Sequence, residues 1–389
     1  METSDFQAAR WKKEIEAGEK AIERMDWEEA GERSAAALQI AEGWGKNDPR
    51  LAESLREHGT VLMVTGELEE AEDCFRRELQ ILLQLRGAGH VEVARCLHGL
   101  GTLFNSKGEY AEAKSILTDA RDIYTKHFGA DHHVVANLLS NLAEALAGLE
   151  EWVEAEELLE QALKIYQQKE GPANLLVGNI HYQFGKLYEE QERLREAEAN
   201  YQRSLAIMEK ADGGPLVALL LSQLGGLYLD LQEWGQAESS FRRCLELKER
   251  ALGPQHPALA ETLHDLGLVF HEQGLAAKAE PWFQRALALV ESAHGPNSLA
   301  LADYLEELAE IYEEQERYDK VSDLYERAGD ILEEHPEELL DTDQFEKDLT
   351  QLALSRAIKF KGPRHTPAKK KSAGKKTGKK TRKTARKKH

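Results

Sequence analysis

Long apolar runs are missing from this chain of 389 residues, and so is a secretory signal at its start. No stretch contains the roughly 20 consecutive apolar residues that a membrane-spanning helix needs. The acidic opening METSDFQ lacks the basic-then-apolar order of a cleaved leader. These absences exclude a membrane span and predict a soluble chain in the cytoplasm or an equivalent compartment.

Cysteine is also scarce. Cys74, Cys96 and Cys244 form neither a disulfide framework nor a metal-ligand spacing. Cys244 occupies a repeat column of small residues, which favours a packed thiol. Cys74 and Cys96 fall on successive predicted helices and are expected to stay reduced. We therefore expect no metal site and no cofactor.

Proline and aromatic residues are few as well. The chain has 10 prolines and 7% aromatic residues, whereas 31% of its residues are charged. This composition is typical of a helix-rich soluble protein rather than a sheet protein. Length alone suggests two or three globular domains, but internal repetition outweighs that expectation.

The clearest repeat unit runs from residue 253 to residue 295. Apolar residues recur at helical spacing in both halves, for example Leu263, Leu266 and Phe270 in the first. A Gly-containing break near Gln273 separates the halves. The unit is predicted to be a helical hairpin that must stack on neighbours, because it is too small to bury its own apolar seam.

The unit recurs with a step of 42 residues and one step of 40. A glycine marks each boundary and suits a helix end, where a left-handed backbone costs glycine little. These glycines are Gly45, Gly87, Gly129, Gly171, Gly213, Gly253 and Gly295. Each first helix carries a small residue expected to let the two helices approach closely: Gly59, Gly101, Ala143, Gly185, Gly225, Gly267 and Ala309. The second helices carry a bulky column: Phe75, Leu117, Leu159, Tyr201, Phe241, Phe283 and Tyr325.

This order, with a large residue, Leu, Gly or Ala and an aromatic in one helix and Ala, aromatic, Ala in the next, resembles the tetratricopeptide repeat. The 42-residue period and the connection Gly253, Pro254, His256, Pro257 are similar to kinesin light chain repeats. The resemblance covers roughly residues 45–333. It implies an all-α fold, a right-handed superhelical α-solenoid of stacked antiparallel helical hairpins.

Four segments are predicted from these patterns. Residues 1–44 are interpreted as a degenerate capping hairpin and residues 45–333 as an array of about seven repeats. Residues 334–360 are expected to form a C-terminal capping helix. Residues 361–389 are expected to be disordered, because no large apolar residue there can offset chain entropy by burial.

The last segment reverses the charge of the chain. It has fourteen Lys or Arg and no Asp or Glu, which leaves 36 basic and 70 acidic residues and a net charge of −34 in 1–360. The residues expected to contact a polyanion are Lys369, Lys370, Lys371, Lys375, Lys376, Lys379, Lys380, Arg382, Lys383, Arg386, Lys387 and Lys388. The segment could contact the phosphates of DNA or RNA, with a nucleoid or nuclear association, or compete for the protein's own acidic groove.

Catalytic signals are poor. A lysine-rich stretch of the tail resembles a phosphate loop, but the spacing of its glycines is one residue short and no strand precedes it. His127, His132 and His133 are interpreted as surface loop histidines. His181 falls in a column of Leu and is interpreted as a hydrogen-bonded core residue whose pKa burial lowers. With no constellation of nucleophile, base and stabiliser, we expect no enzyme.

Partner binding is the leading hypothesis. In the family that the repeats resemble, the concave groove comes mainly from first helices, at positions that face outward from the seam. These positions hold Arg56, Thr60, Met63, Arg95, His98, Asn105, Asn137, Ser140, Glu144, Asn179, Tyr182, Lys186, Ser222, Leu229, Glu261, His264, His271, Asp303, Glu306 and Glu310. Asn, Ser, Tyr and Arg can bond the backbone of an extended peptide. The resemblance thus implies an adaptor that binds a peptide or helix of a partner protein.

The last positions of this set form an acidic face. Asp303, Glu306 and Glu310 recur at helical spacing, and Glu261 belongs to the preceding copy. A site for a basic ligand and an ordinary solvated surface both remain open. The alternatives to a simple adaptor are a nucleic-acid-associated adaptor anchored by the tail and an adaptor that the tail inhibits.

Overall fold

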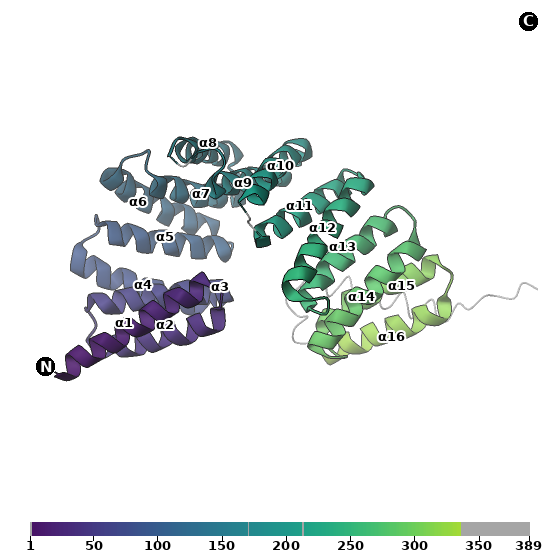
Figure 1. Ribbon diagram of the computed structural model, residues 1–389, viewed down its shortest axis with the longest axis horizontal. Coiled ribbons are helices and arrows are strands. Elements are labelled where there is room, and N and C mark those ends of the chain that lie inside the picture. Colours follow the sequence, from purple (N-terminus) through teal and green to yellow (C-terminus); the bar gives the residue numbers. More distant parts are fainter. Residues whose placement is uncertain (1, 170, 212–213, 336–389) are drawn as a thin grey trace, which may run out of the picture. The chain divides into compact units, whose positions relative to one another are not determined.

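The computed structural model describes residues 2–169, 171–211 and 214–335 (Figure 1). Within these ranges the chain forms α-helices and two short 3-10 helices and contains no β-strand. The α-helices are α1 (Glu2–Glu23), α2 (Trp27–Glu42), α3 (Pro49–Thr65), α4 (Leu68–Arg86), α5 (Val91–Ser106), α6 (Tyr110–Phe128), α7 (His133–Gly148), α8 (Trp152–Lys169), α9 (Leu175–Glu190), α10 (Leu194–Lys210), α11 (Gly214–Asp230), α12 (Trp234–Leu252), α13 (Ala260–His271), α14 (Ala276–His294), α15 (Ala302–Glu314) and α16 (Tyr318–Glu334). The 3-10 helices are η1 (Pro257–Leu259) and η2 (Leu299–Leu301).

Consecutive helices pair into antiparallel hairpins, α1 with α2, α3 with α4 and so on (Figure 1). From α2 to α13, the second helix of one hairpin packs on the first helix of the next, as α6 does on α7 and α8 on α9. The fold is therefore the all-α solenoid of stacked hairpins that the sequence predicted. The chain divides into two compact units, Met1–Leu289 and Val290–His389, with the boundary inside α14. The described part of the second unit holds the end of α14, η2, α15 and α16.

The small column of the first helices makes room for the bulky column of the second, which confirms the reason inferred from the sequence. A Cβ atom added to Gly185 of α9 would lie 2.4 Å from Cδ1 of Tyr201 in α10. Tyr201 is fully buried. The copy that has Ala143 at the equivalent position carries the smaller Leu159 in its second helix. The two columns are thus matched in size in these two hairpins.

The connections between hairpins end one helix and begin the next. Gly253 has φ 87° and ψ 158°, a region that is open essentially to glycine alone. The sequence predicted a left-handed helical glycine here, so the sign of φ is confirmed and ψ is corrected. His256 Nδ1 then accepts the Ala258 N–H at 3.2 Å, and His132 Nδ1 accepts the Val134 N–H at 3.3 Å at the start of α7. The histidine of this connection is a helix cap.

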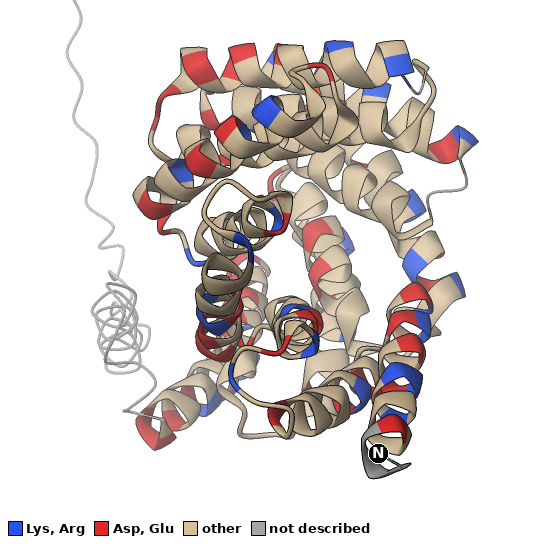
Figure 2. Ribbon diagram, turned by 90° about the vertical axis from the view of Figure 1, so that its left-hand side faces the viewer, with Lys and Arg blue, Asp and Glu red and all other residues tan. Residues whose placement is uncertain are grey.

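In two of these connections, an arginine of the following second helix donates a hydrogen bond to a backbone carbonyl of the connection. Arg285 Nη2 lies 2.6 Å from Glu249 Oε1 and donates to the Pro254 carbonyl at 3.1 Å. Arg327 repeats the arrangement in the second unit, with Glu291 and Pro296. Figure 2 shows Asp and Glu along the helices with Lys and Arg interspersed. Partly exposed pairs of this kind contribute roughly 0–1 kcal/mol each.

Within each hairpin, the tight turn has one residue at positive φ. Glycine occupies it at Gly66, Gly108 and Gly274, with φ between 69° and 91°. Other residues occupy the equivalent position elsewhere, at φ 57° to 60°: Met25, Glu150, Glu192, Gln232 and Glu316. These turns carry a backbone cost that the glycine turns avoid.

Several sequence expectations can now be placed. Cys74, Cys96 and Cys244 are buried free thiols, and Cys244 is the packed thiol that was predicted. No helix in the described ranges has the length and apolarity needed to cross a membrane. The limits of the capping segments and of the array stay predictions. Residues 336–389 lie outside the described part of the chain, and with them most of the predicted C-terminal helix and the whole basic tail.

Candidate functional site

A pocket of about 130 Å³ in the first unit lies between α7 and α9, the first helices of two consecutive hairpins. We call it the α7–α9 pocket. From α7 it is lined by Ser140, Ala143, Glu144, Ala147 and Gly148, and from α9 by Asn179, Tyr182, Gln183, Lys186, Leu187 and Glu190. Both sets begin with the spacing i, i+3, i+4, i+7, i+8, so each is one face of one helix. Tyr110 of α6 and Leu159 of α8 complete the lining.

The pocket has an apolar wall and a polar rim. Leu159 and Leu187 in the wall are buried. Glu144, Asn179 and Glu190 at the rim are exposed. A cleft of this kind suits a group with an apolar body and a polar end, because the wall gains from burial while the rim fixes orientation.

One repeat earlier, the equivalent space between α5 and α7 is filled by hydrogen-bonded side chains. Asn141 Nδ2 donates to Thr102 Oγ1 at 2.8 Å and to His98 Nε2 at 2.9 Å. Asn105 Nδ2 donates to the Asn141 carbonyl oxygen at 2.8 Å. Burial lowers the pKa of His98 to about 4, so the ring is neutral near pH 7 and can accept the Asn141 proton. We call these four residues the α5–α7 plug.

In the α7–α9 pocket, the same four repeat positions carry different residues. The replacements are Ser140 for His98, Glu144 for Thr102, Ala147 for Asn105 and Gln183 for Asn141. All four replacements line the pocket. Ser140 and Ala147 are too short to fill the space, and Gln183 Oε1 is shielded from solvent with no hydrogen-bond partner among the described residues. The pocket therefore arises from side-chain substitutions within a regular helix arrangement.

The electrostatics of the rim are dominated by carboxylates. Burial raises the pKa of Glu190 because it disfavours the charged form. Lys186 opposes this rise, whereas Glu144 and Glu189 add to it. Burial likewise raises the pKa of Tyr182. Three carboxyl groups, those of Glu144, Glu189 and Glu190, therefore lie in the neighbourhood of one ammonium group, that of Lys186.

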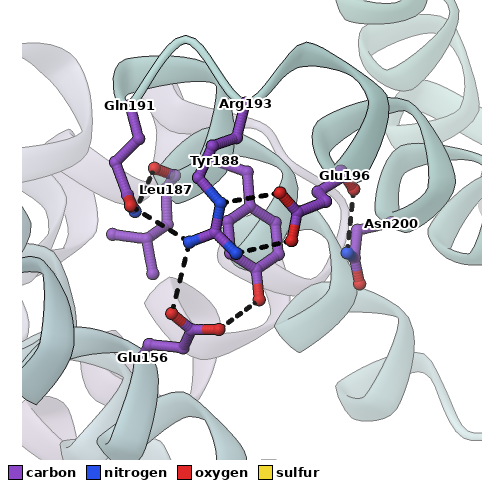
Figure 3. Close-up of polar contacts among 7 residues, drawn as sticks. All are labelled: Glu156, Leu187, Tyr188, Gln191, Arg193, Glu196 and Asn200. Atoms are coloured by element: carbon purple, nitrogen blue, oxygen red, sulfur yellow. Dashed lines mark hydrogen bonds and ion pairs between the residues drawn. The ribbon is translucent and has the colours of Figure 1, made fainter.

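A polar network next to the pocket fixes the turn between α9 and α10 (Figure 3). Arg193 bonds Glu196 through Nε at 2.7 Å and Nη2 at 2.5 Å, and Glu156 of α8 lies 3.4 Å from Nη1. The guanidinium lies 4.2 Å from the ring centroid of Tyr188, whose hydroxyl donates to Glu156 at 2.6 Å. Because Tyr188 follows the pocket residue Leu187, the network anchors this end of α9 to two neighbouring helices.

The structure brings five of the predicted groove residues together in the pocket: Ser140, Glu144, Asn179, Tyr182 and Lys186. The prediction of an outward-facing side chain is wrong for two residues. Asn105 is 6% exposed because it belongs to the plug, and Ser140 is 3% exposed because it lies on the pocket wall. Sequence reasoning missed Gln183 and Glu190 as site residues. Their signal was their position four residues after Asn179 and Lys186, on the same helical face.

The remaining predicted residues do not line this pocket. Arg95 and Asn137 are exposed on α5 and α7, Arg56 is half-buried on α3, and His98 is in the plug. Glu261, His264 and His271 belong to the first unit, and Asp303, Glu306 and Glu310 to the second. A shared role for these two groups, like the acidic face itself, stays a prediction.

Two interpretations of histidines are resolved. His181 is half-buried, its Nδ1 lies 3.0 Å from Asn200 Oδ1, and burial lowers its pKa, as predicted. The interpretation of His127, His132 and His133 as loop histidines is corrected, because His127 lies in α6, His133 is the first residue of α7 and His132 caps α7. Among the described residues, no group of three or more His, Cys, Asp or Glu could hold a metal ion.

Comparison with known proteins gives a consistent picture. The model of the Tetratricopeptide repeat family matches residues 50–126, 134–210, 216–292 and 271–334, which is more than half of the chain. No curated protein sequence gives a significant match.

Three solved structures illustrate the likeness. BtubC (BKLC) from P. vanneervenii is 19% identical, covers 69% of this chain and 96% of its own, and has a TM-score of 0.50. A Rap protein complexed with Competence and Sporulation Factor is 16% identical, with 91% and 99% covered and a TM-score of 0.52. A putative kinesin light chain from Podosopora anserina is 19% identical, with 52% and 98% covered and a TM-score of 0.47. At these identities, the likeness to the first two structures shows the fold alone.

Proposed function

Because this chain belongs to the tetratricopeptide repeat family, we propose that it is a non-enzymatic scaffold that binds a segment of a partner protein across α7 and α9. The observation that carries the proposal is the α7–α9 pocket, whose lining comes from consecutive first helices. The regular packing positions of the repeat form the core. The pocket lies at positions where this copy departs from the preceding one, which is where specificity for a partner can reside.

Exposed leucines on α9 and on the next first helix offer apolar surface to a bound segment. Leu175 and Leu176 lie one turn before Asn179 on α9 and are each 42% exposed. Leu216 and Leu219 lie near the start of α11, the next first helix, and are also exposed. A bound segment that covers these side chains would remove apolar surface from water, at about 25 cal/mol per Å². The Rap protein was solved with a bound factor, which supports a ligand for this fold.

The test transplants the plug into the pocket. Linear dodecapeptides from a random display library are selected on the full-length protein and on the double variant Ser140→His, Ala147→Asn. Selected peptides are then measured by fluorescence anisotropy. We expect peptides that bind the native protein and lose at least tenfold affinity for the variant, because the grafted side chains occupy the pocket. A matched control, Ser239→His with Ala206→Asn on exposed positions of α12 and α10, should bind as the native protein does.

The proposal would be abandoned if every selected peptide bound the native and plugged proteins equally. Circular dichroism of both variants shows whether each remains folded. A loss of binding in the exposed control as well would mean that the substitutions act through the fold.

A second candidate function concerns residues 361–389, and the observation that favours it is their charge. Fourteen basic residues without an acid suit a polyanion, with affinity that falls steeply with salt. Removal of 361–389 should abolish binding to double-stranded DNA or RNA at low salt. If the segment instead competes for the protein's own groove, its removal should strengthen binding of the selected peptides. Unchanged nucleic-acid and peptide binding would reject both roles.

A further inference from the structure

The charges around the α7–α9 pocket discriminate between partner side chains, an inference that rests on the proposed function. Among the charged residues that line the pocket, Glu144 and Glu190 are acidic and Lys186 is basic. Glu189 acts on both Glu190 and Tyr182, so its charge is felt at the pocket as well. A cation that enters the pocket gains from three carboxyl groups and is opposed by one ammonium. An anion meets the reverse balance.

The hydrogen-bonding groups point to the same class of ligand. The carboxylates of Glu144 and Glu190, both of which line the pocket, are hydrogen-bond acceptors. A donor-rich group that enters the pocket can bond these carboxylates, and the guanidinium of arginine or the ammonium of lysine carries donors only.

The size and walls of the pocket fit a long side chain with an apolar stem. Its volume of about 130 Å³ corresponds to roughly four water molecules at about 30 Å³ each. Ala147 and Leu187 provide apolar surface for methylene groups, and Glu144 and Glu190, the exposed acidic residues of the lining, provide carboxylates for a charged end. Lysine and arginine commonly bury their stems along apolar surface in this way.

We propose that the α7–α9 pocket takes the side chain of an arginine or lysine from a segment of a partner protein. The stem packs against Ala147 and Leu187, and the charged end lies at Glu144 and Glu190. Residues of the segment next to the cation contact the exposed leucines at the start of α9. An acidic or phosphorylated side chain is excluded, because it would bring a further negative charge beside the carboxylates.

The display selection on the native protein and on the plugged variant also tests this proposal. Among dodecapeptides that need an open pocket, we expect an arginine or lysine at one fixed position. The best such peptide is then synthesised with citrulline in place of arginine, or norleucine in place of lysine, to remove the charge. This change should weaken binding about tenfold, as expected for a hydrogen bond to a charged group.

Variants of the protein locate the effect. Glu144→Gln with Glu190→Gln should weaken the cationic peptide about tenfold and leave the neutral peptide almost unchanged. The control Glu154→Gln with Glu157→Gln removes two exposed carboxylates of α8 that do not line the pocket, and should change neither affinity by more than about threefold, the size expected of distant screened charges.

The outcomes separate the two proposals. Pocket-dependent peptides without a fixed cation, or with a fixed Asp or Glu, would overturn the cationic ligand and leave the binding scaffold intact. An absence of pocket-dependent peptides would overturn both. Equal binding of the charged and neutral peptides would also reject the cation.

The pH dependence supplies a readout that a structural effect would not mimic. Burial and the nearby Glu144 and Glu189 raise the pKa of Glu190, and Lys186 lowers it. A cationic ligand favours the ionised carboxylate, so affinity should rise as pH increases through the pKa of Glu190. The Glu190→Gln variant and the neutral peptide should both lose this rise. A cationic peptide that binds independently of pH would contradict a contact with Glu190.

Discussion

The α5–α7 plug and the α7–α9 pocket occupy equivalent places in consecutive repeats, yet one is filled and the other is open. In the plug, Asn141 bonds Thr102 and His98, and Asn105 bonds back to Asn141. In the pocket, Ser140 and Ala147 are shorter than the residues they replace, Glu144 adds a charge, and Gln183 is a longer amide. Among the described residues, an amide oxygen without a hydrogen-bond partner occurs in both places, at Asn105 Oδ1 in the plug and at Gln183 Oε1 in the pocket. The helices are the same in kind, so the side chains decide whether the space at a repeat junction is filled or open.

The comparison separates two kinds of position in a repeat. Columns in which all copies agree hold the hairpins together, and a departure there should change stability. Positions that vary at the junctions either bond the next repeat, as Asn141 does, or leave the space open, so a departure there should change stability in the first case and binding in the second. The predictions below probe departures of both kinds, from the largest expected effect to the smallest.

The strongest departure lies on α4. Glu78 stands in a column that elsewhere holds Ala120, Ala162, Ser204, Cys244, Ala286 and Ala328. It is 1% exposed, and its Oε2 has no partner among the described residues. Burial raises the pKa of Glu78 to about 7, although Cys96, Arg56 and Arg95 lower it. The folded protein thus keeps this carboxyl protonated where the unfolded chain ionises it.

The expected consequence is a pH-dependent loss of stability. Below a pKa near 4.5 the group is neutral in both states, and its contribution falls as pH rises from about 4.5 to about 7. Above pH 7 the loss is complete, at about 3 kcal/mol for a shift of this size. Glu78→Ala should therefore stabilise the protein by about that amount at pH 8, and the gain should shrink toward pH 4.5.

Urea unfolding at several pH values measures this effect. Glu70→Ala, at an exposed position of the same helix, controls for the loss of one negative charge. A Glu78→Ala variant no more stable than the native protein at pH 8 would show that Arg56 and Arg95 compensate the buried charge.

The two junctions can be compared through equivalent amides. Asn141→Ala removes the donor that links α7 to Thr102 and His98. It should cost about 2 kcal/mol, because the hydrogen bonds are lost and their buried partners are left unsatisfied. Gln183→Ala should cost less than about 0.5 kcal/mol, because its Oε1 makes no bond that could be lost. Equal unfolding midpoints for the two variants would contradict the contrast between plug and pocket.

Much of the fold follows directly from the sequence. The hairpins and their order could be predicted because glycine and bulky columns recur with a fixed step, and these columns reflect packing that every copy must satisfy. The role of His256 and His132 as helix caps could not be predicted from the sequence as readily. A cap depends on the backbone N–H two residues on, and residue type alone does not distinguish it from a loop histidine.

The site could be predicted only in part. Ser140, Glu144, Asn179, Tyr182 and Lys186 were found because the family places its groove on first helices. The pocket itself could not be derived, since it depends on the absence of the plug, and the plug requires Asn141 to reach across to the preceding repeat. Asn105 was misjudged for the same reason. Whether a polar side chain faces solvent or bonds the next repeat is a three-dimensional property that a repeat register does not contain.

Two adjacent glycines in α11 allow a direct comparison, because Gly225 belongs to the repeated small column and Gly226 does not. A Cβ at Gly225 would lie 2.6 Å from the Phe241 ring, whereas a Cβ at Gly226 would meet no atom within 4 Å. Gly225→Ala should destabilise the protein by about 1 kcal/mol or more, because overpacking outweighs the gain in helix propensity. Gly226→Ala should stabilise it by about 0.5–1 kcal/mol. Thermal unfolding of both variants provides the measurement, and effects of the same sign would refute the steric role of the small column.

The smallest effect concerns the tight turns. Gln232 has φ 57°, whereas three equivalent turns use Gly66, Gly108 and Gly274. Because a side chain at positive φ costs about 1 kcal/mol and glycine returns part of this through its larger unfolded-state entropy, Gln232→Gly should stabilise the protein by roughly 0.5 kcal/mol. The control Gln161→Gly, in the exposed face of α8, should instead destabilise it by about 0.5–1 kcal/mol. If both substitutions lowered the unfolding midpoint in urea, relief of backbone strain would not explain why the other turns use glycine.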